Sequence, residues 1–278
     1  MYELRSIIMQ SQSIPRVKSL WITIYLSGAL LAISLIFILV DPRSLNDISV
    51  WVKPIKFNVS FGLHLLTIIW MLSYIDPEVL RRKSSGVIVG AMSIAVALEV
   101  SYITLQAARG RPSHFNFETL IERLGYQVVM GVSVLIIVLL TFYIGVLLLR
   151  KPKPGVNVGI RWGGAIGLCL GSVLTLVVAG YLSSRSAHWV SGIPSDEGGL
   201  PIVGWSRTGG DLRVTHFFAT HLMQFLPLVG LLLDKLNRNG RLGTIFIITL
   251  ITLLSLVSVV IVYLTFIQAL RGEALIGL

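Results

Sequence analysis

Seven long apolar stretches alternate with shorter polar ones along the chain. A helix that crosses a bilayer needs roughly 20 mostly apolar residues, and seven segments have this length. They are Leu20–Val40, Phe57–Ile75, Ser84–Ala108, Leu124–Leu149, Trp162–Ser184, Val214–Leu233 and Leu242–Leu270. The pattern predicts an all-α, polytopic integral membrane protein, with one seven-helix transmembrane domain over residues 1–278 and no internal repeat.

The composition supports this reading. Of the 278 residues, 54% are hydrophobic and 13% are charged, against about 25% charged residues in a typical soluble domain. These values exclude an ordinary soluble protein, a disordered chain and a disulfide-stapled secreted module. The single cysteine, Cys169, allows neither an internal disulfide nor a cysteine-rich metal site.

The net charge of +10 predicts an orientation rather than a nucleic-acid partner. Most of the surplus lies in the N-terminal segment and in the loops after the second, fourth and sixth helices. It includes Arg5, Arg16, Arg81, Lys151 and Arg238. The positive-inside rule then places the N-terminus in the cytoplasm and the C-terminus outside. We expect a multi-pass protein of a cell membrane, of the bacterial cytoplasmic-membrane kind, that binds no nucleic acid.

The segments on the other side are long and unusual in composition. They read DPRSLNDISVWVKPIKF, QAARGRPSHFNFETLIERLGYQ and SSRSAHWVSGIPSDEGGLPIVGWSRTGGDLRVTHFFATH. Four of the five histidines lie in or beside these segments. Loops with such residues tend to carry function.

Three predicted helices carry polar residues along one face each, because the residues recur at helical spacing. The second has Lys56, Ser60 and His64; the third has Glu99, Tyr102, Gln106 and Arg109; the sixth has Arg213, His216, Thr220 and Gln224, with His221 close to that face. At 1.5 Å per residue, His64, Glu99 and His221 fall at similar depths near the middle of the membrane. Ionisable groups at such depths are costly and mark functional sites by default.

Two histidines and a carboxylate suit catalytic zinc or non-haem iron. We expect His64, Glu99 and His221 to be the metal ligands, with His114, His188 and His216 as a second group. The expected catalytic residues are Glu99, Tyr102 and Asp211, and the expected substrate-binding residues are Lys56, Gln106, Arg109, Arg213, His216 and Gln224. The favoured function is a metal-dependent membrane enzyme that acts on a small anionic or lipid-like ligand drawn by the cationic groups.

Other readings of the same residues stay open. His64 and His221 suit the axial ligands of haem b in an electron-transfer protein, with Gly163, Gly167 and Gly171 giving room for a macrocycle or for close helix packing. An anion or proton-coupled transporter also fits. Asp211 equally suits a helix N-cap. Besides the lipid bilayer and the small ligand, the sequence leaves room for a homo-oligomer. The chain contains no GxxxxGK[ST], CxxC or HExxH motif.

Overall fold

The computed structural model describes residues 17–277 and contains, in that range, seven helices long and apolar enough to cross a membrane. The long helices are α2 (Lys18–Val40), α3 (Val52–Leu72), α5 (Lys83–Ala108), α7 (Gly131–Arg150), α8 (Val158–Ser183), α9 (Leu212–Leu236) and α10 (Thr244–Leu270). The prediction of a helical bundle with seven apolar spans is confirmed. Arg5 and Arg16, which contribute to the charge asymmetry, lie outside the described residues.

Shorter elements connect the long helices. They are the antiparallel strands β1 (Ser44–Leu45) and β2 (Ile48–Ser49), the helices α4 (Pro77–Arg81) and α6 (Leu120–Leu124), and the π-helical η1 (Gly125–Met130). Thr119 caps α6, because its hydroxyl accepts a hydrogen bond from the backbone N–H of Glu122 at 3.2 Å. Helix α6 and η1 lead directly into α7, so the fourth span begins before the predicted Leu124.

Helix α3 begins at Val52 and not at the predicted Phe57. The apolar window misses its first turn because Lys53 and Lys56 are charged. Pro54 does not interrupt the helix, since a proline in the first turn replaces an N–H that has no partner within the helix. The earlier start makes Lys53 part of the bundle.

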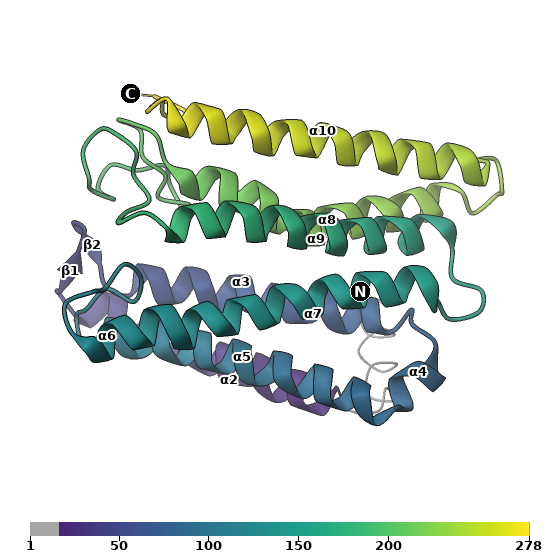
Figure 1. Ribbon diagram of the computed structural model, residues 1–278, viewed down its shortest axis with the longest axis horizontal. Coiled ribbons are helices and arrows are strands. Elements are labelled where there is room, and N and C mark those ends of the chain that lie inside the picture. The colour runs from purple at the N-terminus through teal and green to yellow at the C-terminus, as the bar shows by residue number, and fades with distance from the viewer. Residues whose placement is uncertain (1–16, 278) are drawn as a thin grey trace.

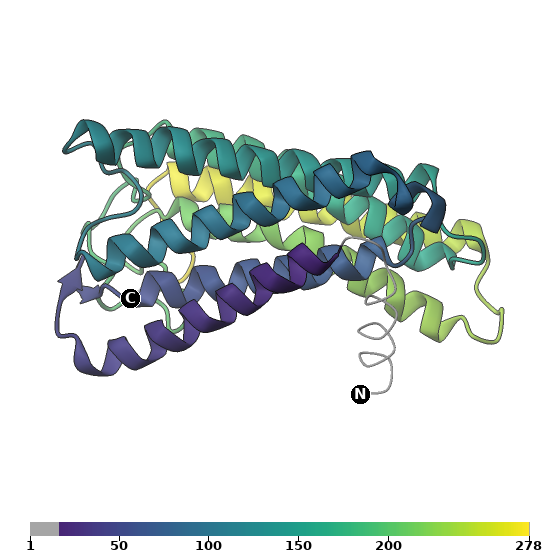
Figure 2. The same ribbon diagram turned by 90° about the horizontal axis from the view of Figure 1, so that it is seen from below.

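The helices run side by side between two distinct ends (Figures 1 and 2). One end carries β1, β2, α6 and the long segment 184–211, with the C-terminus nearby; we call it the loop-rich end. The opposite end carries α4 and the connections from α7 to α8 and from α9 to α10; we call it the basic end. Figure 1 shows α8, α9 and α10 as one group of helices and α2, α3, α5 and α7 as another.

Glycines let α8 pack directly on α9. A Cβ atom on Gly163 would collide with the carbonyl oxygen of Leu226, and one on Gly167 would lie 2.8 Å from Cδ of Pro227. On Gly171 it would lie 2.7 Å from Cγ of Met223. In this structure these glycines serve close helix packing rather than room for a macrocycle.

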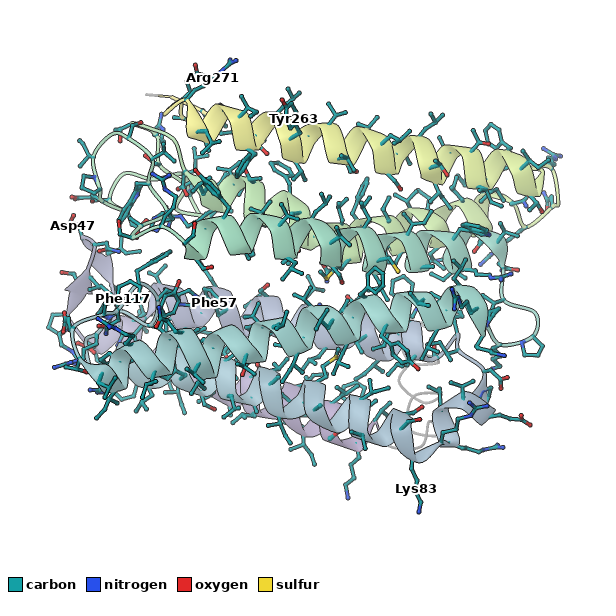
Figure 3. The ribbon with its side chains drawn as sticks, viewed as in Figure 1. Asp47, Phe57, Lys83, Phe117, Tyr263 and Arg271 are labelled. Carbon is teal, nitrogen blue, oxygen red and sulfur yellow. The ribbon has the colours of Figure 1, made fainter. Side chains whose placement is uncertain are left out.

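The outward surface of the bundle is strongly apolar. Leu39 is 84% exposed, Ile245 is 81% exposed and Val87 is 71% exposed. Exposed apolar residues on this scale are unusual in soluble monomers and suit contact with lipid chains. Figure 3 shows side chains such as Tyr263 projecting outward between the two ends.

Candidate functional site

All five histidines of the chain lie along one route through the described bundle. His188 in the segment 184–211 and His114 between α5 and α6 lie at the loop-rich end, followed by His216 and His221 on α9 and by His64 on α3. Each is within electrostatic range of the next. We call these five residues the histidine file. It joins the two expected histidine groups into one feature.

Hydrogen bonds fix the ring tautomers at the deep end of the file. Thr141 Oγ1 donates to the Ile137 carbonyl at 2.8 Å, so it accepts at 3.2 Å from Nε2 of His64. Nδ1 of His221 donates to the Gln224 side-chain oxygen at 3.2 Å. Nδ1 of His64 and Nε2 of His221 are therefore left without hydrogen, and each can accept a proton or a metal ion.

A charged cluster closes the route at the loop-rich end. Arg213 binds Asp211 at 2.6 Å and Asp196 at 2.7 Å, and His188 lies 3.5 Å from the same Asp196 oxygen. Burial alone would raise the pKa of Asp196, but the His188 ring and the Arg213 guanidinium lower it to about 2. Burial lowers the pKa of His188 despite the nearby carboxylate. At neutral pH, Asp196 in this cluster is therefore ionised and His188 is neutral.

The segment 184–211 is tied down over this end by backbone contacts. The Lys56 ammonium donates to the Val203 carbonyl at 2.9 Å, and Arg213 donates to the Gly204 carbonyl at 2.8 Å. The N–H of Asp196 donates to the Asn46 carbonyl, which joins the segment to the β1–β2 hairpin. Lys56 and Arg213, both expected to hold substrate, therefore hold this segment in place.

Asp211 has the structural role that the sequence allowed. Its Oδ1 accepts a hydrogen bond from the N–H of Arg213 at 3.0 Å and so caps the start of α9. Its Oδ2 accepts from the N–H of Ser206 at 3.0 Å. Both oxygens are occupied, so Asp211 positions Arg213 and the loop before α9.

Lys53 is a site residue that the sequence reasoning missed. Its ammonium lies 5.8 Å from the centroid of the Phe57 ring, and its charge acts on Glu99 and on His114. No ion pair holds it within residues 17–277. Its side chain is partly buried. The sequence could have indicated Lys53, because it lies three residues before Lys56 and residues at this spacing are neighbours on the surface of a helix.

His114 lies against an aromatic wall at the same level. Its ring centroid is 5.4 Å from that of Phe57 and 5.6 Å from that of Tyr126, and its Nδ1 is 3.1 Å from the Ser113 hydroxyl. Phe57 is seen near the loop-rich end in Figure 3. Burial lowers the pKa of His114 well below its usual range, and the charges of Lys53 and other histidines lower it further. His114 is therefore neutral at neutral pH.

Among the buried polar atoms without a hydrogen-bond partner in the described part of the chain, two belong to predicted site residues within the long helices. They are Oε1 of Glu99 and Nδ1 of His216. Glu99 is 1% exposed. A buried polar atom without a partner costs free energy, and such atoms mark places where a ligand, a proton or water completes the structure.

The other residues of the predicted stripe on α5 form a separate network. The Arg109 guanidinium binds the carboxylate of Glu122 at 2.9 Å, and the Gln106 amide donates to Glu122 and, at 3.0 Å, to the Tyr102 hydroxyl. Arg111 lies 3.4 Å from the same carboxylate. Glu122 comes from α6, so this network fastens the loop-rich end of α5 to the start of the fourth span, and none of its hydrogen bonds or ion pairs involves a histidine.

The expected metal ligands do not gather into one group. Glu99 has Lys53 as its electrostatic neighbour, whereas His64 has His221. Among residues 17–277, no group of three or more His, Cys, Asp or Glu side chains is placed to hold a metal ion. The three-residue metal centre is therefore without support from the described side chains.

No known protein family, curated protein or solved structure matches this chain.

Proposed function

We propose that this protein is a membrane-embedded enzyme that acts on a small anionic or lipid-like substrate beside the histidine file. The observation that carries the proposal is the convergence of all five histidines with Lys53 and the unpartnered Glu99 inside an otherwise apolar bundle. Such groups are expensive to bury in a membrane domain and are seldom placed there without a role.

Lys53 supports the anionic character of the substrate. Arg213 is neutralised by two carboxylates and Arg109 by Glu122. Lys56 donates to a carbonyl. Among residues 17–277, Lys53 has no ion pair and can attract a negative group, and it lies beside the Phe57 ring, which suits an apolar part of the substrate.

Proton transfer is the chemistry that the side chains support. His216, with a buried and unpartnered nitrogen, and the buried carboxyl of Glu99 are groups that can act as base and acid. His114 and His188 lead from His216 toward the loop-rich end, where protons can exchange with water. In this proposal Glu99 and His216 touch the substrate, and Asp211 and Arg213 position the segment that covers it.

The direct test is turnover in proteoliposomes. The purified protein is reconstituted with a bacterial polar lipid extract, and headgroup composition is followed over time by mass spectrometry. We expect the wild-type protein to convert one lipid class, and Glu99→Gln and Lys53→Met to abolish the conversion. Tyr102→Phe is the matched control because it keeps the ring and removes only a hydroxyl that is bonded to Gln106 in the Glu122 network. Equal lipid composition with wild type and Glu99→Gln would contradict the proposal for lipid-like substrates, and the same assay with water-soluble phosphate and carboxylate esters would then decide it.

A second candidate rests on the bare ring nitrogens of His64 and His221. Two neutral histidines on facing helices can ligate a divalent metal (zinc or non-haem iron), with water or substrate as further ligands, or can be axial ligands of haem b. Absorption spectroscopy and elemental analysis of the detergent-purified protein separate these cases. A Soret band lost in His64→Ala supports haem, and stoichiometric metal lost in the same variant supports the metal. A colourless, metal-free protein that is fully active argues against both.

We also propose the orientation and location that the charge pattern indicates. The basic end faces the cytoplasm of a bacterial cell, the loop-rich end faces outward, and the protein resides in the cytoplasmic membrane. A cysteine-accessibility experiment with Asp47→Cys and Lys83→Cys in a Cys169→Ser background tests this, since these residues lie at opposite ends (Figure 3). Flux of a labelled anion or of protons into proteoliposomes without chemical turnover would favour a transporter instead.

A further inference from the structure

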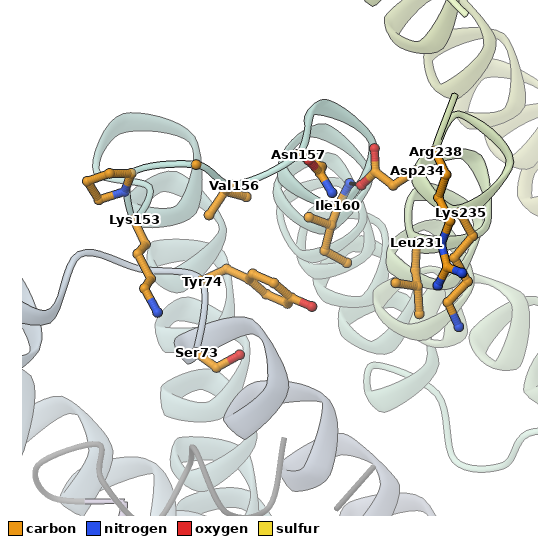
Figure 4. A pocket seen from close by; sticks show the side chains of 12 residues that line it. Ser73, Tyr74, Lys153, Val156, Asn157, Ile160, Leu231, Asp234, Lys235 and Arg238 are labelled. Carbon is orange, nitrogen blue, oxygen red and sulfur yellow. Dashed lines mark hydrogen bonds between the residues drawn. The ribbon is translucent and has the colours of Figure 1, made fainter. Parts of the chain in front are cut away.

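The two groups of helices are joined mainly through α7 and α8, and α3 touches α9 only sparsely. Helix α9 packs closely against α8 instead. At the basic end, the carboxylate of Asp234 on α9 accepts hydrogen bonds from the N–H groups of Gly159 and Ile160 at 2.8 and 2.7 Å (Figure 4). Helix α9 is therefore held by α8, and the side of the bundle between α3 and α9 is loosely packed.

Polar side chains reach the membrane-facing surface of the bundle on these two helices. On α9, His221 is only partly buried, and the residues one turn before and after it, Phe217 and Phe225, are 38% and 47% exposed. On α3, Lys56 is partly buried and Leu63 is 45% exposed. Residues at these spacings share one face of a helix. Each helix thus has a face on which site residues and lipid-facing residues adjoin.

The segment 184–211 covers the same place from the aqueous side. The Val203 carbonyl accepts a hydrogen bond from Lys56 on α3 at 2.9 Å, and the Trp205 ring packs against Phe217 on α9 with centroids 5.3 Å apart. This stretch therefore bridges α3 and α9 at the loop-rich end. His221 lies one helical turn farther from that end than Phe217. A substrate from water meets the bridge, whereas a lipid of the bilayer meets the two helices below it.

We propose that the site opens sideways into the bilayer between α3 and α9, and that its substrate is an anionic membrane lipid that enters by this route. The inference rests on the proposed function, since it names the substrate class and the entrance of that same site. Lys53 has no ion pair within residues 17–277 and lies at the loop-rich end of α3, so it can hold the headgroup phosphate. The acyl chains stay in the membrane along Leu63 and Phe225, which are exposed.

The accessibility of a nitroxide label at position 221 tests the side opening without any need for turnover. The label is attached to His221→Cys in a Cys169→Ser background, and the full chain is placed in nanodiscs of phosphatidylethanolamine and phosphatidylglycerol. Oxygen, which dissolves in the bilayer, and a water-soluble nickel chelate are the collision probes. Leu256→Cys on the exposed face of α10 is the bilayer reference, and Asp47→Cys in the β1–β2 hairpin is the aqueous reference.

We expect the label at position 221 to collide with oxygen as the bilayer reference does and to be protected from the nickel chelate. Collisions that match the aqueous reference mean that the site opens to water, and collisions with neither probe mean that it is closed. Either of these results overturns the side opening.

Lipid titration followed by native mass spectrometry tests the substrate class. Phosphatidylglycerol and the zwitterionic phosphatidylcholine are titrated in parallel against the full chain in detergent. We expect preferential binding of phosphatidylglycerol, with affinity reduced about tenfold or more by Lys53→Met and by Leu63→Trp, which fills the space where the acyl chains leave the site. Leu256→Trp is the matched control, because Leu256 is also exposed but lies on α10. Leu63→Ala should retain binding, which separates a filled entrance from lost folding.

Failure of this inference is distinguishable from failure of the enzymatic proposal. Selective lipid binding without conversion in the proteoliposome assay contradicts the enzyme and leaves the lipid site intact. Equal affinity for the two lipids overturns the assigned substrate class, whether or not a water-soluble ester is converted. An equal effect of Leu63→Trp and Leu256→Trp on binding overturns the assigned entrance.

Discussion

Asp196 offers the sharpest test of the closed loop-rich end. Replacing it with asparagine removes the charge that pairs with Arg213 at 2.7 Å while keeping the size and shape of the side chain. The Asp196 side chain is 8% exposed, so solvent screens this ion pair weakly. Arg213 keeps Asp211 as a partner, and the helix N-cap is untouched. The substitution therefore perturbs the cover of the site without breaking α9.

The magnitude follows from the pKa of Asp196. Burial acts to raise it, but the neighbouring histidine and arginine bring it from 3.8 to about 2. One pKa unit corresponds to about 1.4 kcal/mol, so the shift corresponds to about 2.5 kcal/mol, and solvent screening of the partly exposed cluster reduces the contribution of the ionised form to about 2 kcal/mol. Because the folded-state pKa is depressed, this contribution is present in full above about pH 4 and is lost as the pH falls toward 2.

The assay is reversible unfolding in mixed micelles, followed by tryptophan fluorescence between pH 7 and pH 2. We expect Asp196→Asn to lower the free energy of unfolding by about 2 kcal/mol at pH 7, with the difference from wild type shrinking below pH 4. Glu197→Gln is the matched control, since Glu197 is an exposed neighbour and loses the same charge. A difference near zero at pH 7, one that is constant with pH, or an equal effect of Glu197→Gln would refute the reasoning.

Further predictions concern packing, protonation and the loop cover. Gly167→Leu should destabilise the fold by more than about 1–3 kcal/mol, because even its Cβ would meet α9, whereas Gly180→Leu should be tolerated because nothing lies near a Cβ there; thermal unfolding in detergent compares the two. Burial lowers the pKa of His114, so stability should fall as the pH drops below about 6.5, and His114→Gln should flatten the melting temperature between pH 7.5 and 5. Lys56→Met should speed limited proteolysis within residues 193–204, because the bond to Val203 is lost. Lys53→Met should leave that cleavage rate unchanged, and equal acceleration by both variants would contradict the separate roles assigned to the two lysines.

The seven spans were predictable because bilayer length and hydrophobicity leave few alternatives. The helix boundaries were less predictable where the first turns of a helix contain charged residues. Helix α3 starts at Val52 because the first turn of a helix tolerates a proline such as Pro54. A search for long apolar stretches excludes this turn because it contains Lys53 and Lys56. The consequence was functional, because the omitted turn contributes the cation that lies beside Phe57.

The candidate site was partly predictable for a different reason. Helical spacing gives the face and depth of a residue along its own helix, so the sequence could assign His64 and His221 to polar faces at similar depths. Spacing does not give the rotation of one helix against another. Glu99 therefore shared a depth with the two histidines in the sequence, while the structure places its electrostatic neighbour at Lys53. No pattern within α5 could have distinguished these outcomes.

The partners of the cationic residues could not be predicted by counting charges along the sequence. Arg109, Arg213 and Lys56 are all near the expected level, yet each has a partner from a loop that is distant in sequence: Glu122, Asp196 and Val203. A carboxylate in a loop looks like solvent-exposed charge until the loop folds back over the helices. Within residues 17–277, these contacts leave Lys53, which has no ion pair, to attract an anion at the loop-rich end. Lys56 holds the covering segment through the Val203 carbonyl and Lys53 does not, so Lys53→Met should affect the attraction of an anion and Lys56→Met the attachment of the segment.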